Sequence, residues 1–394
     1  MKLHIAPELL AAELAAITGI LDKKTTVAAH EFVLLETTGK HVRLVVSNGL
    51  MQTEAFIPVN HVDYKDKIRC YGDVKMCLPA KKLEALVKLL NGGVVEISVD
   101  EKGHGHLKHN KSEFKLSSIV PDMFPQMSGE FGETVGLPAQ EMRSMIHLAR
   151  GFIGEDDSRF AFSGGLLSLS RGAVSLTGTD GQRLSYSVVE HDLVARNTNI
   201  LIPHKALVQL REMIGKGGDL KMAIARNTRG EVSKVKFKIG HRFLTTNLTA
   251  GAFPNVDAAL SMRVHAKADV TLDKHEFLDA LKRTLVVNEA GNRIVQIFLD
   301  GDGEELALST DGIDAGSDRV RVVDLDTDDA YDSFTLGMNG DHLSAFLNVV
   351  KEASTSDNVV LRYAGPTNFV ELRPAEAGMV DFRYLVAPVR PLNN

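Results

Sequence analysis

The stretch Thr179-Asp180-Gly181-Gln182-Arg183-Leu184 decides the fold, because its turn recurs twice elsewhere in the chain. Ser47-Asn48-Gly49 and Thr310-Asp311-Gly312 occupy the same place between alternating apolar segments, which are typical of β-strands joined by a hairpin. The three turn glycines lie 132 and 131 residues apart. A constant period of this length indicates internal repeats that are each long enough to form a domain.

A second landmark has nearly the same period. In each repeat an amphipathic helix is followed by two or three alternating strands and a closing strand that contains a proline. These prolines, Pro125, Pro254 and Pro388, lie 129 and 134 residues apart. The two landmarks together predict three domains, at residues 1–130, 131–262 and 263–394.

Two helices are expected in each domain, because apolar residues recur at i, i+3, i+4 and i+7. The first domain shows this with Leu83, Leu86, Val87 and Leu90. The six predicted helices span residues 8–24, 80–91, 138–153, 204–217, 273–289 and 340–354. About eight mostly antiparallel strands accompany each pair. The fold class is therefore α+β, with three tandem copies of a domain in which two helices pack on antiparallel sheets.

The composition of the chain argues against several classes of protein. The 394 residues carry a formal net charge of −6, which argues against a protein that grips nucleic acid by bulk positive charge. Only Cys70 and Cys77 occur, so a disulfide framework is excluded and a cytoplasmic location is expected. No apolar run reaches the length of a membrane span. Glu8 and Glu13 interrupt the first apolar stretch, which does not fit a secretory signal.

Catalytic signatures are absent from the sequence. It contains no G-x-x-x-x-G-K-[ST], G-x-S-x-G, H-E-x-x-H or paired C-x-x-C motif. Nothing marks either cysteine as an activated thiol. We therefore predict no catalytic residue and no cofactor.

Two clusters have the residue types of metal ligands without the spacing of a known site. His104, His106 and His109 lie in a polar, glycine-containing stretch that is typical of a hairpin tip, and no carboxylate or cysteine accompanies them at a suitable spacing. The acidic run Asp324, Asp326, Asp328 and Asp329 lacks the glycine and the final glutamate of a calcium loop. We predict no metal site, and a metal-dependent enzyme that uses the histidine cluster stays open as an alternative.

The chain resembles the β subunit of bacterial DNA polymerase III, the replicative sliding clamp. Three motifs carry the resemblance: the stretch 179–184, Ala252-Phe253-Pro254-Asn255, and Tyr384-Leu385-Val386-Ala387-Pro388-Val389-Arg390 near the end of the chain. The threefold repeat extends it over essentially the whole chain. Gln182 departs from the family, in which histidine is common at this position, and His342 replaces an aromatic residue.

The resemblance implies a head-to-tail homodimer, closed into a ring of six domains through which duplex DNA passes. Such a clamp is not an enzyme; it tethers the polymerase III catalytic subunit, the clamp loader and other proteins that carry a clamp-binding motif. A groove between the second and third domains would bind that motif. The positions that match the groove are Phe162, Thr179, Gly181, Gln182, Arg183, Leu184, Pro254, Asn339, Val370, Leu385, Val386, Pro388, Val389 and Arg390.

The resemblance also implies a subunit junction and a surface that faces DNA. Phe114 and Leu116 of one subunit would meet Leu285 and Val286 of the other. The candidate DNA-facing residues are Lys23, Lys24, Lys81, Lys82, Lys88, Arg143, Arg150, Lys205, Arg211, Lys282 and Arg283. The six predicted helices contain 14 Lys or Arg and 12 Asp or Glu, a small positive excess that suits loose, sequence-independent contact. A repeat-built interaction scaffold that never encircles DNA is the alternative.

Overall fold

The structure is a computed structural model that describes residues 2–38, 40–59, 64, 67–100, 102–154, 160–192, 197–215, 217–261, 266–288, 293–328 and 331–389. Asp329 and Arg390, both named above, lie outside the described residues. One order of elements occurs three times: a strand, a helix, several hairpin-connected strands, a second helix and three more strands. This order confirms the predicted α+β class and the threefold repeat.

The elements of the three repeats are as follows. The first contains β1 (Lys2–Ile5), α1 (Pro7–Ile17), β2 (Phe32–Thr38), β3 (His41–Ser47), β4 (Met51–Pro58), β5 (Ile68–Tyr71), β6 (Lys75–Pro79), α2 (Ala80–Val87), β7 (Val95–Val99), β8 (Gly105–His109) and β9 (Ser112–Leu116). The second contains β10 (Val135–Leu137), α3 (Ala139–Arg150), β11 (Gly164–Ser170), β12 (Ala173–Thr179), β13 (Arg183–Glu190), β14 (Thr198–Pro203), α4 (His204–Ile214), β15 (Leu220–Arg226), β16 (Val232–Ile239), β17 (Arg242–Asn247) and α5 (Val256–Ser261). The third contains β18 (Ala268–Asp273), α6 (Lys274–Val286), β19 (Ile294–Leu299), β20 (Glu305–Thr310), β21 (Gly316–Thr327), β22 (Phe334–Asn339), α7 (Gly340–Val349), β23 (Asn358–Tyr363), β24 (Val370–Pro374) and β25 (Asp381–Val386).

The chain divides into two compact units, which follow its hydrogen-bonded sheets. Unit 1 comprises residues 1–140 and 205–248, and unit 2 comprises 141–204 and 249–394. Unit 1 holds the sheets β5-β1-β7-β8-β9 and β10-β15-β16-β17-β4-β3-β2-β6, and unit 2 holds β14-β11-β12-β13-β25-β24-β23-β18-β21-β20-β19-β22. The strands of the second repeat are thus shared between sheets of the other two. The predicted domain limits follow the repeat and stay a prediction.

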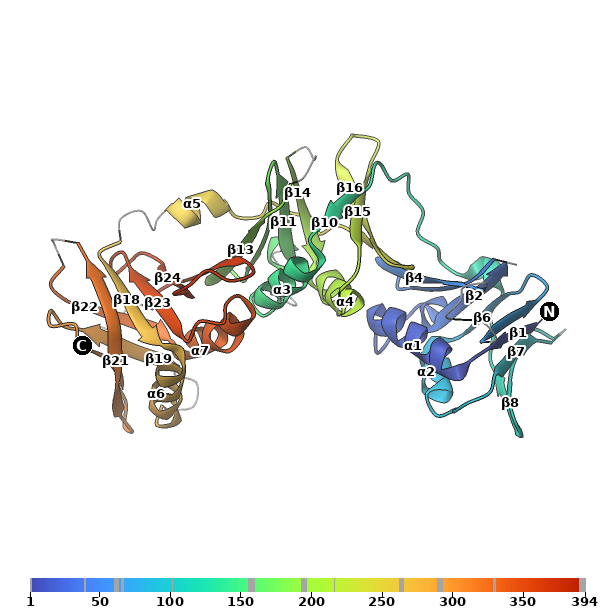
Figure 1. Cartoon of the computed structure of the whole chain (residues 1–394), viewed down its shortest axis with the longest axis horizontal. Helices are drawn as coiled ribbons and strands as arrows, with labels where there is room; N and C mark the ends of the chain where they lie inside the picture. The colour runs from blue at the N-terminus through green and yellow to red at the C-terminus, as the bar shows by residue number, and fades with distance from the viewer. Residues whose placement is uncertain are drawn as a thin grey trace. The chain divides into compact units, whose positions relative to one another are not determined.

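The core of unit 1 lies between its helices and its sheets. Helices α1 and α2 lie side by side (Figure 1). The apolar face of α1 is buried, with Leu10, Leu14 and Ile17 fully enclosed. Pro7 occupies the first position of α1, where its missing N–H breaks no hydrogen bond. On another part of the large sheet, Phe124 of the segment that links the first two repeats covers Leu34, Val45 and Cys77.

The core of unit 2 contains a chain of aromatic rings beneath its sheet. Phe152 lies 4.8 Å from Tyr384 between ring centroids, and Phe346 lies 5.6 Å from Tyr384 and 5.9 Å from Phe382. Such spacings are within the favourable range for aromatic pairs. Asp273 caps helix α6, because its carboxylate accepts the backbone N–H groups of His275 and Glu276 at 2.8 Å each.

The six predicted helices are present, and each is shorter than predicted. The first was expected to reach residue 24, but α1 ends at Ile17 and only a short 3-10 turn, Thr18–Ile20, follows. Lys23 and Lys24 therefore lie outside the helix on which the sequence placed them. Helix α5 was not predicted, because six residues are too short to show a helical period.

Candidate functional site

The turn from Thr179 to Arg183 is held together by the side chains of its own motif. The hydroxyl of Thr179 donates to the backbone carbonyl of Arg183 at 2.6 Å and accepts the N–H of Gly181 at 3.1 Å. The carboxylate of Asp180 accepts the N–H groups of Gln182 and Arg183 at 3.0 Å each. Gly181 has a φ of +90°, which favours glycine. The motif therefore builds the turn before any partner is present.

Arg183 joins this turn to the aromatic core. Its Nε donates to Asp180 at 2.7 Å, and a terminal nitrogen donates to the carbonyl of Gly151 at 3.3 Å. The guanidinium lies 5.1 Å from the centre of the Phe152 ring. Burial would raise the pKa of Asp180, but Arg183 and the backbone N–H groups hold it below its usual value. Both side chains therefore stay charged at neutral pH.

Residues 387–389, the last that the structure describes, lie between this turn and β22 of unit 2. Strand β25 pairs with β13 and β24, and beyond it the N–H of Ala387 donates to the carbonyl of Gln182 at 2.9 Å. The N–H of Val389 donates to the carbonyl of Gly337 at 2.7 Å. A side chain at Gly337 would lie 2.6 Å from the carbonyl oxygen of Val389, so only glycine permits this approach.

Asn339, a predicted groove position, and its neighbour His342 support the same region. Asn339 caps α7, because its side-chain oxygen accepts the N–H groups of Asp341 at 2.9 Å and His342 at 3.3 Å. The carbonyl of His342 accepts the hydroxyl of Tyr384 at 3.1 Å. Burial raises the pKa of Tyr384. Burial and the nearby charge of Arg183 lower the pKa of His342, so the neutral form of this imidazole is favoured.

Burial separates the predicted groove residues into two sets. Thr179, Leu184, Val370, Leu385 and Val386 are buried, and Val370 and Val386 are 0 % exposed. These two side chains have no surface for a partner to touch and can only support the site from within the sheet. The predicted positions with accessible surface are Phe162, Gly181, Gln182, Arg183, Pro254, Asn339, Pro388 and Val389.

Pro254 lines a hollow of about 620 Å³ on one face of the sheet of unit 2. Strands β11, β12, β13 and β14 form its floor, and the segment from Phe253 to Asp257 covers it. The chain reaches Pro254 past Gly251, which packs closely against Ala161, the neighbour of Phe162. Sequence reasoning missed this hollow, although the alternation Leu167-Ser168-Leu169-Ser170 was the signal for a sheet with one apolar and one hydroxyl face.

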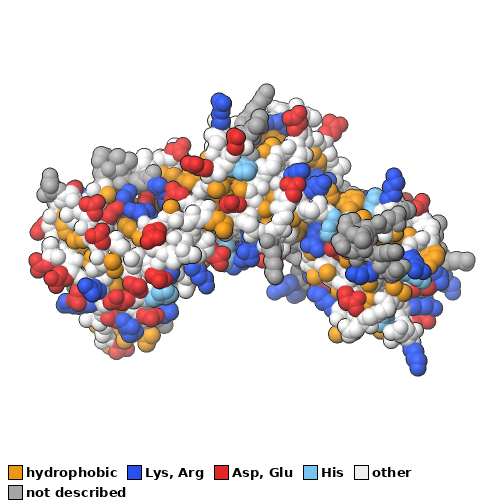
Figure 2. Space-filling view, viewed as in Figure 1, with side chains coloured by type: hydrophobic (Ala, Val, Ile, Leu, Met, Phe, Trp, Pro, Cys, Tyr) orange, Lys and Arg blue, Asp and Glu red, His pale blue; other side chains and the backbone are white. Residues whose placement is uncertain are grey.

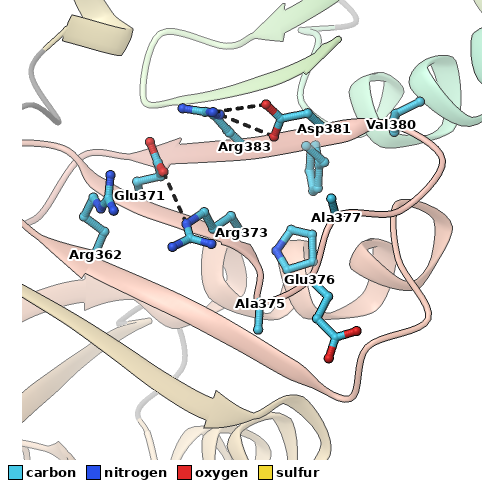
Figure 3. Close-up of a pocket in the computed structure, with 11 residues that line it drawn as sticks. Arg362, Glu371, Arg373, Ala375, Glu376, Ala377, Val380, Asp381 and Arg383 are labelled. Atoms are coloured by element: carbon cyan, nitrogen blue, oxygen red, sulfur yellow. Dashed lines mark hydrogen bonds and ion pairs between the residues drawn. The ribbon is translucent and has the colours of Figure 1, made fainter. Parts of the chain in front are cut away.

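A second hollow, of about 290 Å³, lies on β23, β24 and β25 (Figure 3). Three arginines line it, and each is engaged by a carboxylate. Arg383 pairs with Asp381 at 3.0 Å, and Arg373 approaches Glu371 at 3.9 Å. The two nitrogens of Arg362 bond to both oxygens of Asp269 at 2.7 and 2.6 Å. Because these charges are already compensated, we assign the second hollow a structural role.

The candidate DNA-facing residues fall into two sets, those with and those without an ion pair to a described carboxylate. Lys81 and Lys88 share Glu84, at 3.6 and 2.6 Å, and Lys205 pairs with Asp22. Arg211, Lys282 and Arg283 pair with Glu212, Asp279 and Asp318 at 2.8, 3.3 and 2.6 Å. Within the described residues, no ion pair engages Lys23, Lys24, Lys82, Arg143 or Arg150. Among the described residues, no carboxylate competes with an external anion for this second set.

The predicted junction residues differ in exposure. Phe114 and Leu116 are partly exposed on β9, the last strand of its sheet. Val286 is 82 % exposed at the end of α6, whereas Leu285 is only 7 % exposed and packs against Gly340. Of this pair, only Val286 offers substantial apolar surface to another subunit.

The three histidines of the first cluster do not all bond to the same partner. His104 and His106 share Asp100, at 3.4 and 3.0 Å, but His109 bonds to the carbonyl of Gly92 at 2.7 Å. Among the described residues, no group of three or more His, Cys, Asp or Glu side chains is placed to hold a metal ion. Burial raises the pKa of the Cys77 thiol to about 12, which keeps it protonated.

Charge is unevenly distributed over unit 2. Residues 300–332 contain twelve Asp or Glu and two Arg. Figure 2 shows acidic side chains gathered over the end of unit 2 that carries β19–β22.

None of the described helices is long and apolar enough to cross a membrane.

Comparison with solved structures gives the class of fold. The DNA polymerase sliding clamp of Bacillus subtilis aligns over 99 % of both chains with a TM-score of 0.87 and 18 % identity. The DNA polymerase III subunit beta of Pseudomonas aeruginosa aligns over 99 % of this chain and 100 % of its own, with a TM-score of 0.87 and 19 % identity. The fold is that of the sliding clamps.

Sequence comparison identifies the family. The family model of the DNA polymerase III beta subunit N-terminal domain matches residues 1–128, and the model of its central domain matches residues 136–255. The beta sliding clamp of Staphylococcus aureus is 23 % identical over 375 residues, which are 94 % of each chain. The chain belongs to the DNA polymerase III beta subunit family.

Proposed function

We propose that this chain is a DNA sliding clamp, two copies of which join head to tail into a ring that encloses duplex DNA. The observation that carries the proposal is the threefold repetition of one unit in a chain of the beta subunit family. Two such chains supply six similar domains, and a head-to-tail contact closes when its rotation returns after two subunits. The three domains are assigned to residues 1–130, 131–262 and 263–394.

The clamp tethers partners and performs no reaction of its own. Holding a polymerase on the template raises its effective concentration there and leaves its chemistry unchanged. The partners assigned to it are the polymerase III catalytic subunit, the clamp loader and other proteins with a clamp-binding motif. Its expected location is the cytoplasm.

The partner site is assigned to the region around the turn 179–184 and the end of β25. The accessible positions Gly181, Gln182, Pro388 and Val389 meet there through the Ala387–Gln182 hydrogen bond. A peptide with a glutamine followed by a leucine and a terminal apolar or aromatic pair would place its apolar groups against this surface. A few such anchors dominate the affinity of a peptide.

The ring junction is assigned to β9 and the end of α6. Strand β9 pairs only with β8 among the described strands, so its other edge can accept a strand of a second subunit. Phe114 and Leu116 lie on this edge strand, and Val286 supplies exposed apolar surface on α6. Apolar contacts of this kind are expected at the centre of a stable dimer interface.

The solution mass tests the proposal. One chain has a mass of 42.9 kDa and contains only three of the six domains. Light scattering coupled to gel filtration should therefore give a dimer at micromolar concentration. A monomer under these conditions would exclude a closed ring.

A further inference from the structure

The large sheet of unit 1 has an outer face that is turned away from α1 and α2. Its inner face packs on these helices, and there the hydroxyl of Thr53 donates to the carbonyl of Ile17 at 2.6 Å. Successive residues of a strand point to opposite faces, so Gln52 and Glu54 lie on the outer face. The register of the sheet places the outward residues of the other strands in line with these two.

The outer face is strongly basic, although the chain as a whole is acidic. The chain carries a formal net charge of −6. Up to the bulge after Ala225, the outward positions of β2, β3, β4, β6, β15, β16 and β17 contain six Lys or Arg and two Glu. The basic residues are Arg43, Lys75, Lys221, Lys234, Lys236 and Lys238. A surface with this excess of positive charge attracts an anionic partner.

Two phenylalanines lie among these charges. Phe56 and Phe243 are partly exposed on neighbouring strands, and their ring centroids are 5.4 Å apart. Lys236 and Lys238 lie 4.8 and 5.8 Å from the centroid of the Phe243 ring. Arg43 lies 5.6 Å from that of Phe56. We call Phe56, Phe243, Lys236 and Lys238 the outer patch, which offers apolar and positive surface side by side.

The charges of the outer patch are compensated only in part. Glu54 is 4 % exposed and binds Arg43 at 2.7 Å, whereas its distance to Lys236 is 4.0 Å. Arg43 also binds Glu36 at 2.6 Å. Lys238 is exposed, and among the described residues no carboxylate forms an ion pair with it. The two lysines are therefore the groups to which the carboxylates of a partner would bind.

The outer face already holds an extended segment of its own chain. Residues 126–128, which belong to the link between the first two repeats, cross it beside the outer patch. The N–H of Met127 donates to the side-chain oxygen of Gln52 at 2.7 Å, and the carbonyl of Ser128 accepts the ammonium of Lys234. Outward side chains of two strands thus bind the backbone of a segment that runs across the sheet. A second extended segment can be bound in the same way over the outer patch.

The side chains of the outer patch indicate the chemistry of this second segment. The bases of a single-stranded nucleic acid stack on open aromatic faces, but cations already lie over the rings of Phe56 and Phe243. Carboxylates reach the two lysines without removing them from these rings, and an apolar side chain can pack against the ring edges. The arrangement therefore fits an acidic peptide better than a nucleic acid.

We propose that the outer patch binds an extended acidic segment of a partner protein, in which an aromatic or aliphatic residue stands between Asp or Glu residues. This contact lies on unit 1, whereas the assigned partner site lies on unit 2. It does not depend on the proposed function.

Peptide titration at low salt tests the inference. The full-length protein is titrated into labelled Glu-Asp-Phe-Glu-Asp-Leu-Glu-Asp and into its uncharged counterpart Gln-Asn-Phe-Gln-Asn-Leu-Gln-Asn. The acidic peptide should bind at least about tenfold more tightly, the gain expected from a few exposed charge pairs. Because such pairs are screened, the difference should disappear when the salt concentration is raised from about 50 mM to about 500 mM.

Two substitutions place the binding on the outer patch. Lys238→Glu reverses the charge of an exposed side chain that the fold does not require, and it should weaken the acidic peptide at least about fivefold. Phe243→Leu keeps an apolar side chain but removes the ring, and it should weaken both peptides. Lys102→Glu is the matched control, because it makes the same change of charge at an exposed lysine beside the other sheet of unit 1. It should leave the affinity within about twofold of the native value.

The remaining outcomes would overturn the inference. If the two peptides bind equally, or if Lys238→Glu and Lys102→Glu weaken the acidic peptide by the same factor, the outer patch is not its site. A short labelled oligothymidylate is titrated in parallel. If it binds more tightly than the acidic peptide and loses affinity in Lys238→Glu, the outer patch is a surface for single-stranded nucleic acid and the inference is wrong.

Discussion

Glu13 shows how much a single residue contributes to unit 1. It lies on the buried face of α1 and is 3 % exposed. Arg242, at the start of β17, bonds to both of its carboxylate oxygens at 2.8 and 2.9 Å, and His241 approaches it at 3.0 Å. Burial would raise the pKa of Glu13, but these partners reverse that effect and hold it at about 2.

Glu13→Gln should therefore lower the free energy of unfolding in a pH-dependent way. Against an ordinary value of 4.5, a pKa of about 2 corresponds to about 3 kcal/mol in favour of the folded state. Because the pKa is lowered by folding, this contribution is complete above about pH 5 and is lost as the pH falls towards 2. Denaturant unfolding measures the difference in the free energy of unfolding between the native protein and Glu13→Gln. This difference should be smaller at pH 3.5 than at pH 7. The same change at exposed Glu31 is the control, and a pH-independent difference would contradict this account.

The end of β25 is the first element to test. Deleting residues 388–394 removes the Val389–Gly337 hydrogen bond but leaves the paired strand Asp381–Val386 intact. The truncated protein should remain a folded dimer and bind a peptide with the glutamine, the leucine and the terminal apolar or aromatic pair at least tenfold more weakly, because one side of the assigned site is lost. Fluorescence anisotropy measures this affinity. Deleting only residues 391–394 is the matched control, and equal affinity of all three proteins would place the site elsewhere.

The end of α6 tests the assigned junction. Val286→Asp places a charge on an 82 % exposed side chain, so the fold of one subunit should tolerate it. At an interface core, an unpaired charge costs several kcal/mol, and the variant should therefore be a folded monomer. Leu285 is less suitable, because it is nearly buried within its own chain. Leu50→Asp, at the exposed turn after β3, is the control and should stay dimeric.

The sequence predicts the helices and repeats better than it predicts which residues are buried and which distant residues are in contact. The 3.6-residue period located six helices because an amphipathic face leaves a local pattern. It did not locate the helix ends, where the 3-10 turn after Ile17 depends on tertiary packing. Nor did it indicate that Val370 and Val386 are buried, or that Glu13 pairs with a residue 229 positions away. Contacts between distant strands leave no local signal.

For the whole molecule, the proposed function predicts weak and salt-dependent contact with DNA. Lys24, Lys82 and Arg150 form no ion pair within the described residues, so no described carboxylate competes with phosphates for their charges. Replacing all three with Ala should reduce the slope of log K against log salt by about 2 to 3, since each phosphate contact contributes about 0.9. Lys81, Lys88 and Lys205 are the matched control, because each is paired with a carboxylate. A strong preference for one DNA sequence would contradict the proposal.

Encirclement of DNA is the central claim, and retention on closed DNA tests it most directly. The protein is loaded by its clamp loader onto a nicked circular plasmid, and bound and free protein are then separated by gel filtration in high salt. We predict that it stays with the circle and is released once a single cut linearises the plasmid, because a ring slides off a free end. Equal retention on circular and linear DNA, or none on either, would contradict the account and favour a scaffold that does not encircle DNA.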